Sequence, residues 1–238
     1  MKIAVLGKGP SLNNYSKFTL PKVDHYIIVN NFDQEVLQNE KLKEDLSTTP
    51  VTHVANRSTL SMQGMIDNDM YSQLNIVEHV QPYIDEMKCT HGNCYCGNFK
   101  DGNFDDGRGN VVPTKILSSQ HKEFMFKSGE QQGHPGNKYP YYYPSSGLAA
   151  IAYGVLEILP EYIYLIGFDF HEGGYAVGDS IEKNTAPDSE KLGQRYMLNK
   201  LINGYSSMHF QLHTRVEFES PHQNLILVKI NENKEVQS

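Results

Sequence analysis

Short apolar runs, separated by polar turns that contain glycine, proline or asparagine, recur along the first third of the chain. Four of these runs have strand length and are rich in Val and Ile, at Lys2–Leu6, Tyr26–Val29, Val51–Ala55 and Asn75–Val80. Two more β-type segments follow near the other end, at Met208–Phe218 and Leu225–Ile230. Because helix-forming stretches alternate with the runs, the pattern predicts an α/β domain built on a parallel sheet.

The stretch from Pro144 to Tyr175 carries the strongest pattern in the chain. Between Leu148 and Leu159 apolar residues recur at helical spacing and small or aromatic residues fill most of the other face, which predicts a buried helix. Ser145 and Ser146 supply an N-cap, and Pro160 ends the helix. The following run, Tyr162–Phe168, predicts a central parallel strand covered on both faces.

Small polar motifs follow three of the predicted strands directly. Gly7-Lys8-Gly9-Pro10-Ser11 comes after the first, Asn30 after the second and Asn56 after the third. A strand that runs into a glycine-rich turn can bring backbone N–H groups close to a phosphate, and ligands of open α/β sheets bind at the carboxyl ends of the strands. A plain turn explains each motif equally well when it is taken alone.

Two segments lack a regular pattern. Residues 81–143 are expected to form a long irregular insertion, and residues 176–205 a lid that includes an amphipathic helix at Glu190–Ile202. The cluster Cys89, His91, Cys94 and Cys96 matches no common zinc spacing, so we expect reduced thiols in a loop. Asp101–Asn110 lacks the glycine and the glutamate of an EF-hand, so no metal site is predicted. The whole chain, 1–238, is expected to be a single domain.

Composition narrows the class of partner. The net charge of -7 argues against nucleic acid or an anionic membrane surface as the main partner. No apolar run approaches the roughly 20 residues that span a bilayer, and the first residues do not have the pattern of a signal peptide. We therefore expect a cytoplasmic protein, and a homo-oligomer is compatible with the sequence.

Taken together, these motifs resemble those of the bacterial sialyltransferases of glycosyltransferase family 42. The resemblance rests on GKGPSL at 7–12, on Asn30-Asn31-Phe32, on Ser145-Ser146-Gly147 before the helix, and on GFDF at 167–170 followed by Tyr175. These islands cover about half of the chain. The resemblance implies a single Rossmann-like domain with a lid that needs no cofactor or metal. It also implies that this domain transfers sialic acid, with inversion, from CMP-sialic acid to a glycan acceptor.

The resemblance also implies roles for individual residues. Donor-binding residues would be those of the strand ends and of the helix N-terminus: Gly7, Lys8, Gly9, Ser11, Asn30, Asn56, Ser145, Ser146, Gly147, Gly167, Phe168 and Asp169. Among these, Gly167, Phe168 and Asp169 would hold the cytidine. Tyr175 would hydrogen-bond the phosphate leaving group and lower the barrier to its departure.

The chain departs from the family at three positions. Lys8 replaces an asparagine, His171 replaces the tyrosine after the strand end, and the lid lacks the histidine that acts as general base. His171 or Asp188 are the candidates for that base. Two other functions stay open: a metal-dependent pyrophosphokinase with a GxGPSL loop, and a nucleotide-sugar-binding module without activity.

Overall fold

The structure is a computed structural model that describes residues 1–55, 59–82, 95–117, 145–170 and 188–230, the side chains of 59–60, 96 and 188–192 excepted. Its strands are β1 Lys2–Leu6, β2 His25–Val29, β3 Val51–Val54, β4 Ile76–Gln81, β5 Phe99–Lys100, β6 Asn103–Asp105, β7 Val111–Ile116, β8 Tyr162–Ile166, β9 His209–Thr214 and β10 Leu225–Lys229. Its helices are α1 Asp33–Leu37, α2 Glu40–Thr48, α3 Thr59–Asp67, α4 Met70–Gln73, α6 Ser146–Tyr153 and α7 Asp188–Gly204, with short 3-10 or π turns η1 Pro10–Lys17, η2 Cys96–Asn98 and η3 Gly154–Ile158.

The strands form one sheet in the order β10-β9-β8-β1-β2-β3-β4-β7-β6-β5. Strands β10 to β7 in this order are parallel, and β5 and β6 add an antiparallel edge. From β1 the chain proceeds to β2, β3 and β4 on one side, whereas β8 leads to β9 and β10 on the other. The strand order therefore reverses between β1 and β8, which is where open α/β sheets form a crevice for ligands.

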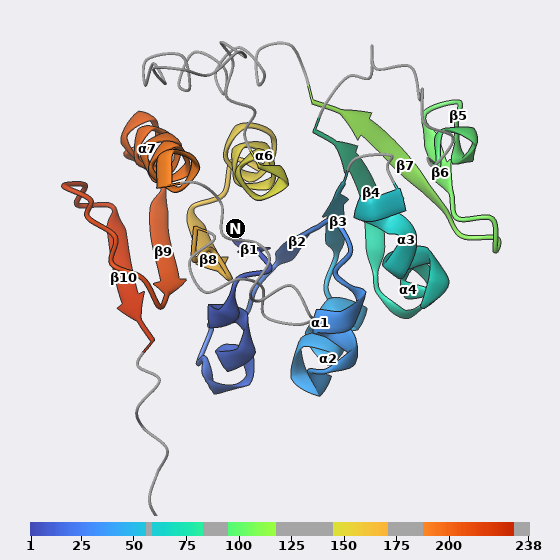
Figure 1. Ribbon diagram of the computed structural model, residues 1–238, viewed down its shortest axis with the longest axis horizontal. Helices are drawn as coiled ribbons and strands as arrows, with labels where there is room; N and C mark the ends of the chain where they lie inside the picture. The colour runs from blue at the N-terminus through green and yellow to red at the C-terminus, as the bar shows by residue number, and fades with distance from the viewer. Residues whose placement is uncertain (56–58, 83–94, 118–144, 171–187, 231–238) are drawn as a thin grey trace, which may run out of the picture.

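Helices cover the sheet on both faces, as Figure 1 shows: α6 and α7 lie on one face, and η1 and α1 to α4 on the other. Each face has its own apolar core, because successive side chains of a strand point to opposite faces. In β8, Ile163 and Leu165 belong to the core under α6 and α7, whereas Tyr164 and Ile166 belong to the opposite core. This confirms the prediction of a Rossmann-like α/β fold with a central strand buried on both faces.

The predicted buried helix is present as α6. All side chains from Leu148 to Tyr153 are buried, and the Ser145 side chain caps the helix by accepting a bond from the Leu148 N–H at 3.3 Å. The helix continues into η3, where a Cβ on Gly154 would lie 2.8 Å from Ile3 Cδ1. The missing side chain thus lets the helix approach the sheet closely.

The sequence missed three short strands within the segment expected to be irregular. β5, β6 and β7 lie there, and β7 pairs in parallel with β4. The segment Asp101–Asn110 around β6 is rich in Asp, Asn and Gly because it forms turns. Asp106 is buried and accepts bonds from the Arg108 and Asn110 N–H groups, while Gly107 and Gly109 have positive φ. The rest of 81–143, with Cys89, His91 and Cys94, lies outside the described residues apart from 81–82, 95–98 and 117.

Candidate functional site

The turns after β1 and β8 meet at the point where the strand order reverses. Pairing between these strands ends at Leu6 and Ile166, but hydrogen bonds continue beyond it. The Gly7 N–H donates to the Ile166 carbonyl at 2.7 Å, and the Gly9 N–H donates to the Gly167 carbonyl at 2.8 Å. The two predicted glycine motifs, which begin at Gly7 and Gly167, therefore form one continuous backbone surface.

Only glycine fits where these turns touch. A Cβ on Gly7 would lie 2.4 Å from the Gly167 carbonyl oxygen, and a Cβ on Gly167 would lie 2.2 Å from the Gly7 carbonyl oxygen. Gly167 also has a φ of 79°, a conformation that a side chain makes costly. The strand β8 ends here, two residues earlier than the predicted Phe168, because this φ turns the chain out of the sheet.

Asp169 holds the two turns to a third strand end. Its Oδ2 accepts the Ser11 N–H at 2.7 Å, and its Oδ1 accepts both the Thr214 hydroxyl and the Arg215 N–H at 2.9 Å. The Ser11 hydroxyl in turn accepts the Gly167 N–H at 3.1 Å. Asp169 is 2% exposed, so its charge is satisfied by protein groups inside the fold. These bonds give Asp169 a holding function that the sequence did not predict.

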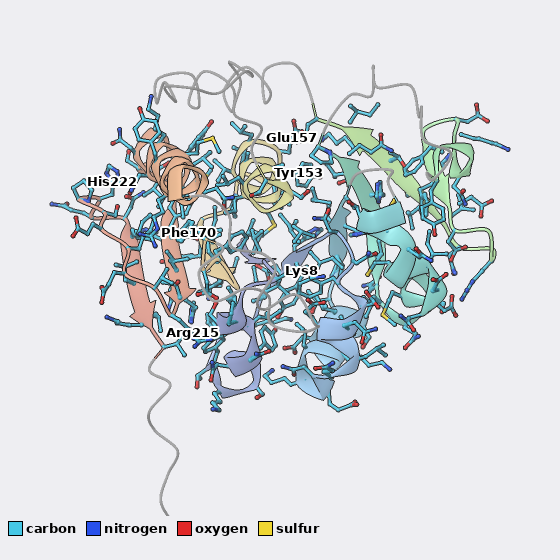
Figure 2. The ribbon with its side chains drawn as sticks, in the orientation of Figure 1. Lys8, Tyr153, Glu157, Phe170, Arg215 and His222 are labelled. Atoms are coloured by element: carbon cyan, nitrogen blue, oxygen red, sulfur yellow. The ribbon has the colours of Figure 1, made fainter. Side chains whose placement is uncertain are left out.

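Lys8 connects the turn after β1 to the segment after β2. Its ammonium group donates to the Asn31 carbonyl and forms an ion pair with Glu35, whose Oε1 lies 3.3 Å away. The Glu35 side chain is fully buried, and this burial raises the pKa of its carboxyl while the Lys8 charge opposes the rise. Lys8 itself stays partly exposed, near the middle of the sheet in Figure 2.

The N-terminus of α6 reaches the same place through Phe168. A Cβ on Gly147 would lie 2.9 Å from Phe168 Cε1, so the aromatic ring packs directly on the first turn of the helix. Ser145, Ser146 and Gly147 are all partly exposed. The N–H groups of Ser146 and Gly147 precede the first intrahelical bond, and with the helix dipole they favour an anion here.

Asn30 ends β2 in a left-handed conformation with a φ of 51°. Its N–H donates to the Val54 carbonyl at 3.0 Å, and its carbonyl lies 2.8 Å from Nε2 of the buried His53. Burial lowers the pKa of His53 to about 4. Among the described residues, the side-chain oxygen Oδ1 of Asn30 is buried and has no hydrogen-bond partner. An unpaired buried acceptor of this kind is uncommon and often marks a functional position.

The described candidate residues thus lie at one edge of the sheet. Four others cannot be placed: Asn56, His171 and Tyr175 lie outside the described residues, and Asp188 is described only as the first residue of α7. Sequence reasoning missed Glu35, His53, Thr214 and Arg215. Thr214 and Arg215 are polar residues at the carboxyl end of β9, as Asn30 is at the carboxyl end of β2. The pattern that singled out Asn30 could therefore have found them.

Neither a membrane span nor a metal cluster emerges from the part of the chain that the structure describes. No helix there combines the length and apolar character needed to cross a bilayer. No group of three or more His, Cys, Asp or Glu side chains among these residues is arranged to hold a metal ion.

Comparison with known proteins finds a structural likeness and no sequence match. No protein-family model matches the chain, and no curated protein does. Among solved structures, the sialyltransferase CST-II in complex with a trisaccharide acceptor and CMP is 19% identical at a TM-score of 0.56, over 98% of this chain and 92% of that one. CstII from Campylobacter jejuni in complex with CMP-3FNeuAc is 18% identical at a TM-score of 0.54, over 97% and 96% of the two chains. Over nearly its whole length, this chain therefore has a fold similar to that of the CstII sialyltransferases.

Proposed function

We propose that this protein is a glycosyltransferase that moves sialic acid from CMP-sialic acid to a glycan acceptor, with inversion and without a metal. The observation that carries the proposal is the meeting of the Gly7 and Gly167 turns at the reversal of strand order, beside the N-terminus of α6. CMP and CMP-3FNeuAc are bound by proteins of similar fold. The described residues of the motifs that resemble family 42 also lie at this edge, whereas Tyr175 lies outside the described residues.

The site provides groups suited to a nucleotide that carries an acidic sugar. The backbone of the two glycine turns, which carries no side chain where the turns touch, and the Phe168 ring, packed on Gly147, form a surface for a nucleoside. The first turn of α6 and the Lys8 ammonium favour negative charge, such as the donor's phosphate and carboxylate. In this proposal Asp169 shapes the cytidine pocket by holding the turn, and Gly167 and Phe168 make the contact.

In the proposed reaction an acceptor hydroxyl oxygen attacks the anomeric carbon while the bond from that carbon to the CMP phosphate breaks. Tyr175 hydrogen-bonds the departing phosphate, and His171 or Asp188 takes the proton of the acceptor hydroxyl. These three roles are predictions from the sequence.

Nucleotide choice tests the proposal first. CMP, CDP, UDP, GDP and ATP are compared for thermal stabilisation, each with and without magnesium. We expect CMP alone to stabilise the protein by about 2.7 kcal/mol at a hundredfold excess over its dissociation constant. A chelator should leave that effect unchanged. Equal or greater stabilisation by ATP with magnesium would instead favour a metal-dependent pyrophosphokinase.

Turnover tests the second half of the proposal. Hydrolysis of CMP-sialic acid and its transfer to a broad set of acceptors are measured for wild type, Tyr175→Phe, His171→Ala and Asp188→Ala. Leaving-group departure can proceed without a base, so Tyr175→Phe should slow hydrolysis more than His171→Ala does. Loss of the true base should reduce transfer by roughly 10²–10⁴-fold while CMP binding persists. A wild type that binds CMP but neither transfers nor hydrolyses the donor would be a binding module.

A further inference from the structure

Asn30 adopts a backbone conformation that needs support. A φ of 51° is in the left-handed region, which asparagine tolerates better than most residues but still at a cost relative to ordinary strand geometry. The residue directly follows β2, and its N–H is bonded to the neighbouring strand at Val54. The side-chain oxygen Oδ1 of this residue is buried and has no hydrogen-bond partner in the part of the chain that the structure describes.

His53 supplies that support from the adjacent strand. It is fully buried on β3, next to Ile28 of β2, and its Nε2 lies 2.8 Å from the Asn30 carbonyl oxygen. A carbonyl only accepts, so Nε2 must carry the hydrogen. In a neutral imidazole the other nitrogen, Nδ1, is then an acceptor, and the Tyr71 hydroxyl lies 2.7 Å from it.

The hydrogen bonds that link His79, Tyr71, His53 and Asn30 can therefore all be assigned a donor and an acceptor without conflict. Tyr71 donates to His53 Nδ1, which leaves the Tyr71 oxygen to accept from His79 Nδ1 at 3.4 Å. Tyr71 and His79 are themselves buried, and the His79 ring stacks on Phe104 with centroids 5.4 Å apart. This packing fixes the His53 ring and its tautomer, so that the N–H of Nε2 always faces Asn30.

We infer that His53 is a positioning residue of the donor site, which holds Asn30 in its left-handed conformation so that the Asn30 amide is presented to the nucleotide sugar. The ligand group that this amide oxygen would take is an N–H or O–H donor, such as an amino or hydroxyl group. The inference rests on the proposed function, since it names a residue that acts on the same site through another.

The size of the effect follows from populations. Without the bond from His53, Asn30 is free to return to the more favourable negative-φ region. If the competent conformation falls to about a tenth of the population, the apparent Kd for CMP rises about tenfold. A residue that merely stabilised the core would lower the unfolding temperature without moving the Kd of the folded protein.

Two measurements on the full chain test the inference. CMP affinity is determined by calorimetry below the unfolding transition, and the NMR coupling between the Asn30 Hα and the preceding carbonyl carbon reports the sign of φ in the free protein. His53→Phe keeps the aromatic volume and removes the donor, whereas His53→Gln keeps an amide donor. His25→Phe is the matched control, because His25 begins β2 at the opposite end from Asn30 and bonds Thr52.

We expect His53→Phe to raise the Kd about tenfold and to reduce the Asn30 coupling, His53→Gln to recover most of both, and His25→Phe to change the Kd by less than about twofold. Unchanged Kd and coupling in His53→Phe would overturn the inference. If wild type does not bind CMP, the proposed function fails and the coupling alone decides whether His53 holds Asn30. If His53→Phe does not fold, His53→Leu takes its place: it also removes the donor to the Asn30 carbonyl, and an unchanged coupling there would equally overturn the inference.

Discussion

Replacing Asp169 by asparagine tests whether its carboxylate ties the three strand ends together. Oδ2 accepts the Ser11 N–H, and Oδ1 accepts the Thr214 hydroxyl and the Arg215 N–H. An asparagine has one acceptor oxygen and one NH₂ group. Whichever way the amide turns, its NH₂ faces a backbone N–H that can only donate. Asp169→Asn therefore leaves a buried N–H without an acceptor.

The magnitude follows from the same geometry. A hydrogen bond to a charged group contributes about 1.5–3 kcal/mol, and a buried N–H left unpaired costs about 1–3 kcal/mol. We expect the free energy of unfolding to fall by about 2–4 kcal/mol, since the amide keeps part of the network. Urea denaturation followed by circular dichroism measures this as a lower midpoint with an unchanged slope. CMP affinity should fall as well, because the Gly167 turn loses its anchor.

Asp33→Asn is the matched control. Asp33 is similarly buried, but its described bonds, from the Gln34 and Asn68 amides, both end on Oδ2. An asparagine at 33 can keep its oxygen there, so the loss of stability should be smaller than at 169. The assigned holding function is wrong if the free energy of unfolding of Asp169→Asn lies within about 0.5 kcal/mol of the wild-type value. It is also wrong if Asp33→Asn lowers the free energy of unfolding more than Asp169→Asn does.

Three further outcomes are expected. Gly167→Ala should destabilise the fold by several kcal/mol, because its Cβ would lie 2.2 Å from the Gly7 oxygen at a φ of 79°. A Cβ on Gly97 would have no atom of the described residues within 4 Å, so Gly97→Ala should be nearly neutral in the same urea titration. Burial lowers the pKa of His53 and of His213 from 6.5 to about 4, so the folded state favours the neutral rings. The contribution of the two rings to the free energy of unfolding should be fully present above pH 6.5 and should be lost as the pH drops toward 4, by about 3 kcal/mol for each ring. His213→Phe should remove the part of this pH dependence that comes from His213. A free energy of unfolding that does not change with pH over this range would contradict both assignments. Lys8→Met should raise the Kd for CMP by roughly three- to tenfold at low salt and less at high salt, and an unchanged Kd would remove Lys8 from the site.

Strand and helix periodicity by itself predicted most of the sheet. The runs at β1, β2, β3 and β4 lie within one residue of their predicted starts, because buried parallel strands are continuous apolar runs and the turns between them are polar. The buried helix α6, apolar from Leu148 to Tyr153, and its Ser145 cap were equally predictable, since both depend on residues within a few positions of each other. The carboxyl-edge location of the motifs followed from the parallel topology.

The tertiary structure decided which residues far apart in the chain bond or pair with each other. Nothing near Asp169 indicates that its acceptors face Ser11, 158 residues earlier, and Thr214, 45 residues later. Nor does local sequence show that β7 pairs with β4 or that His53 supports Asn30. Periodicity records which face of an element is buried, whereas a hydrogen-bond partner across the sheet is set by strand order and register. Those are decided only when all the strands pack together.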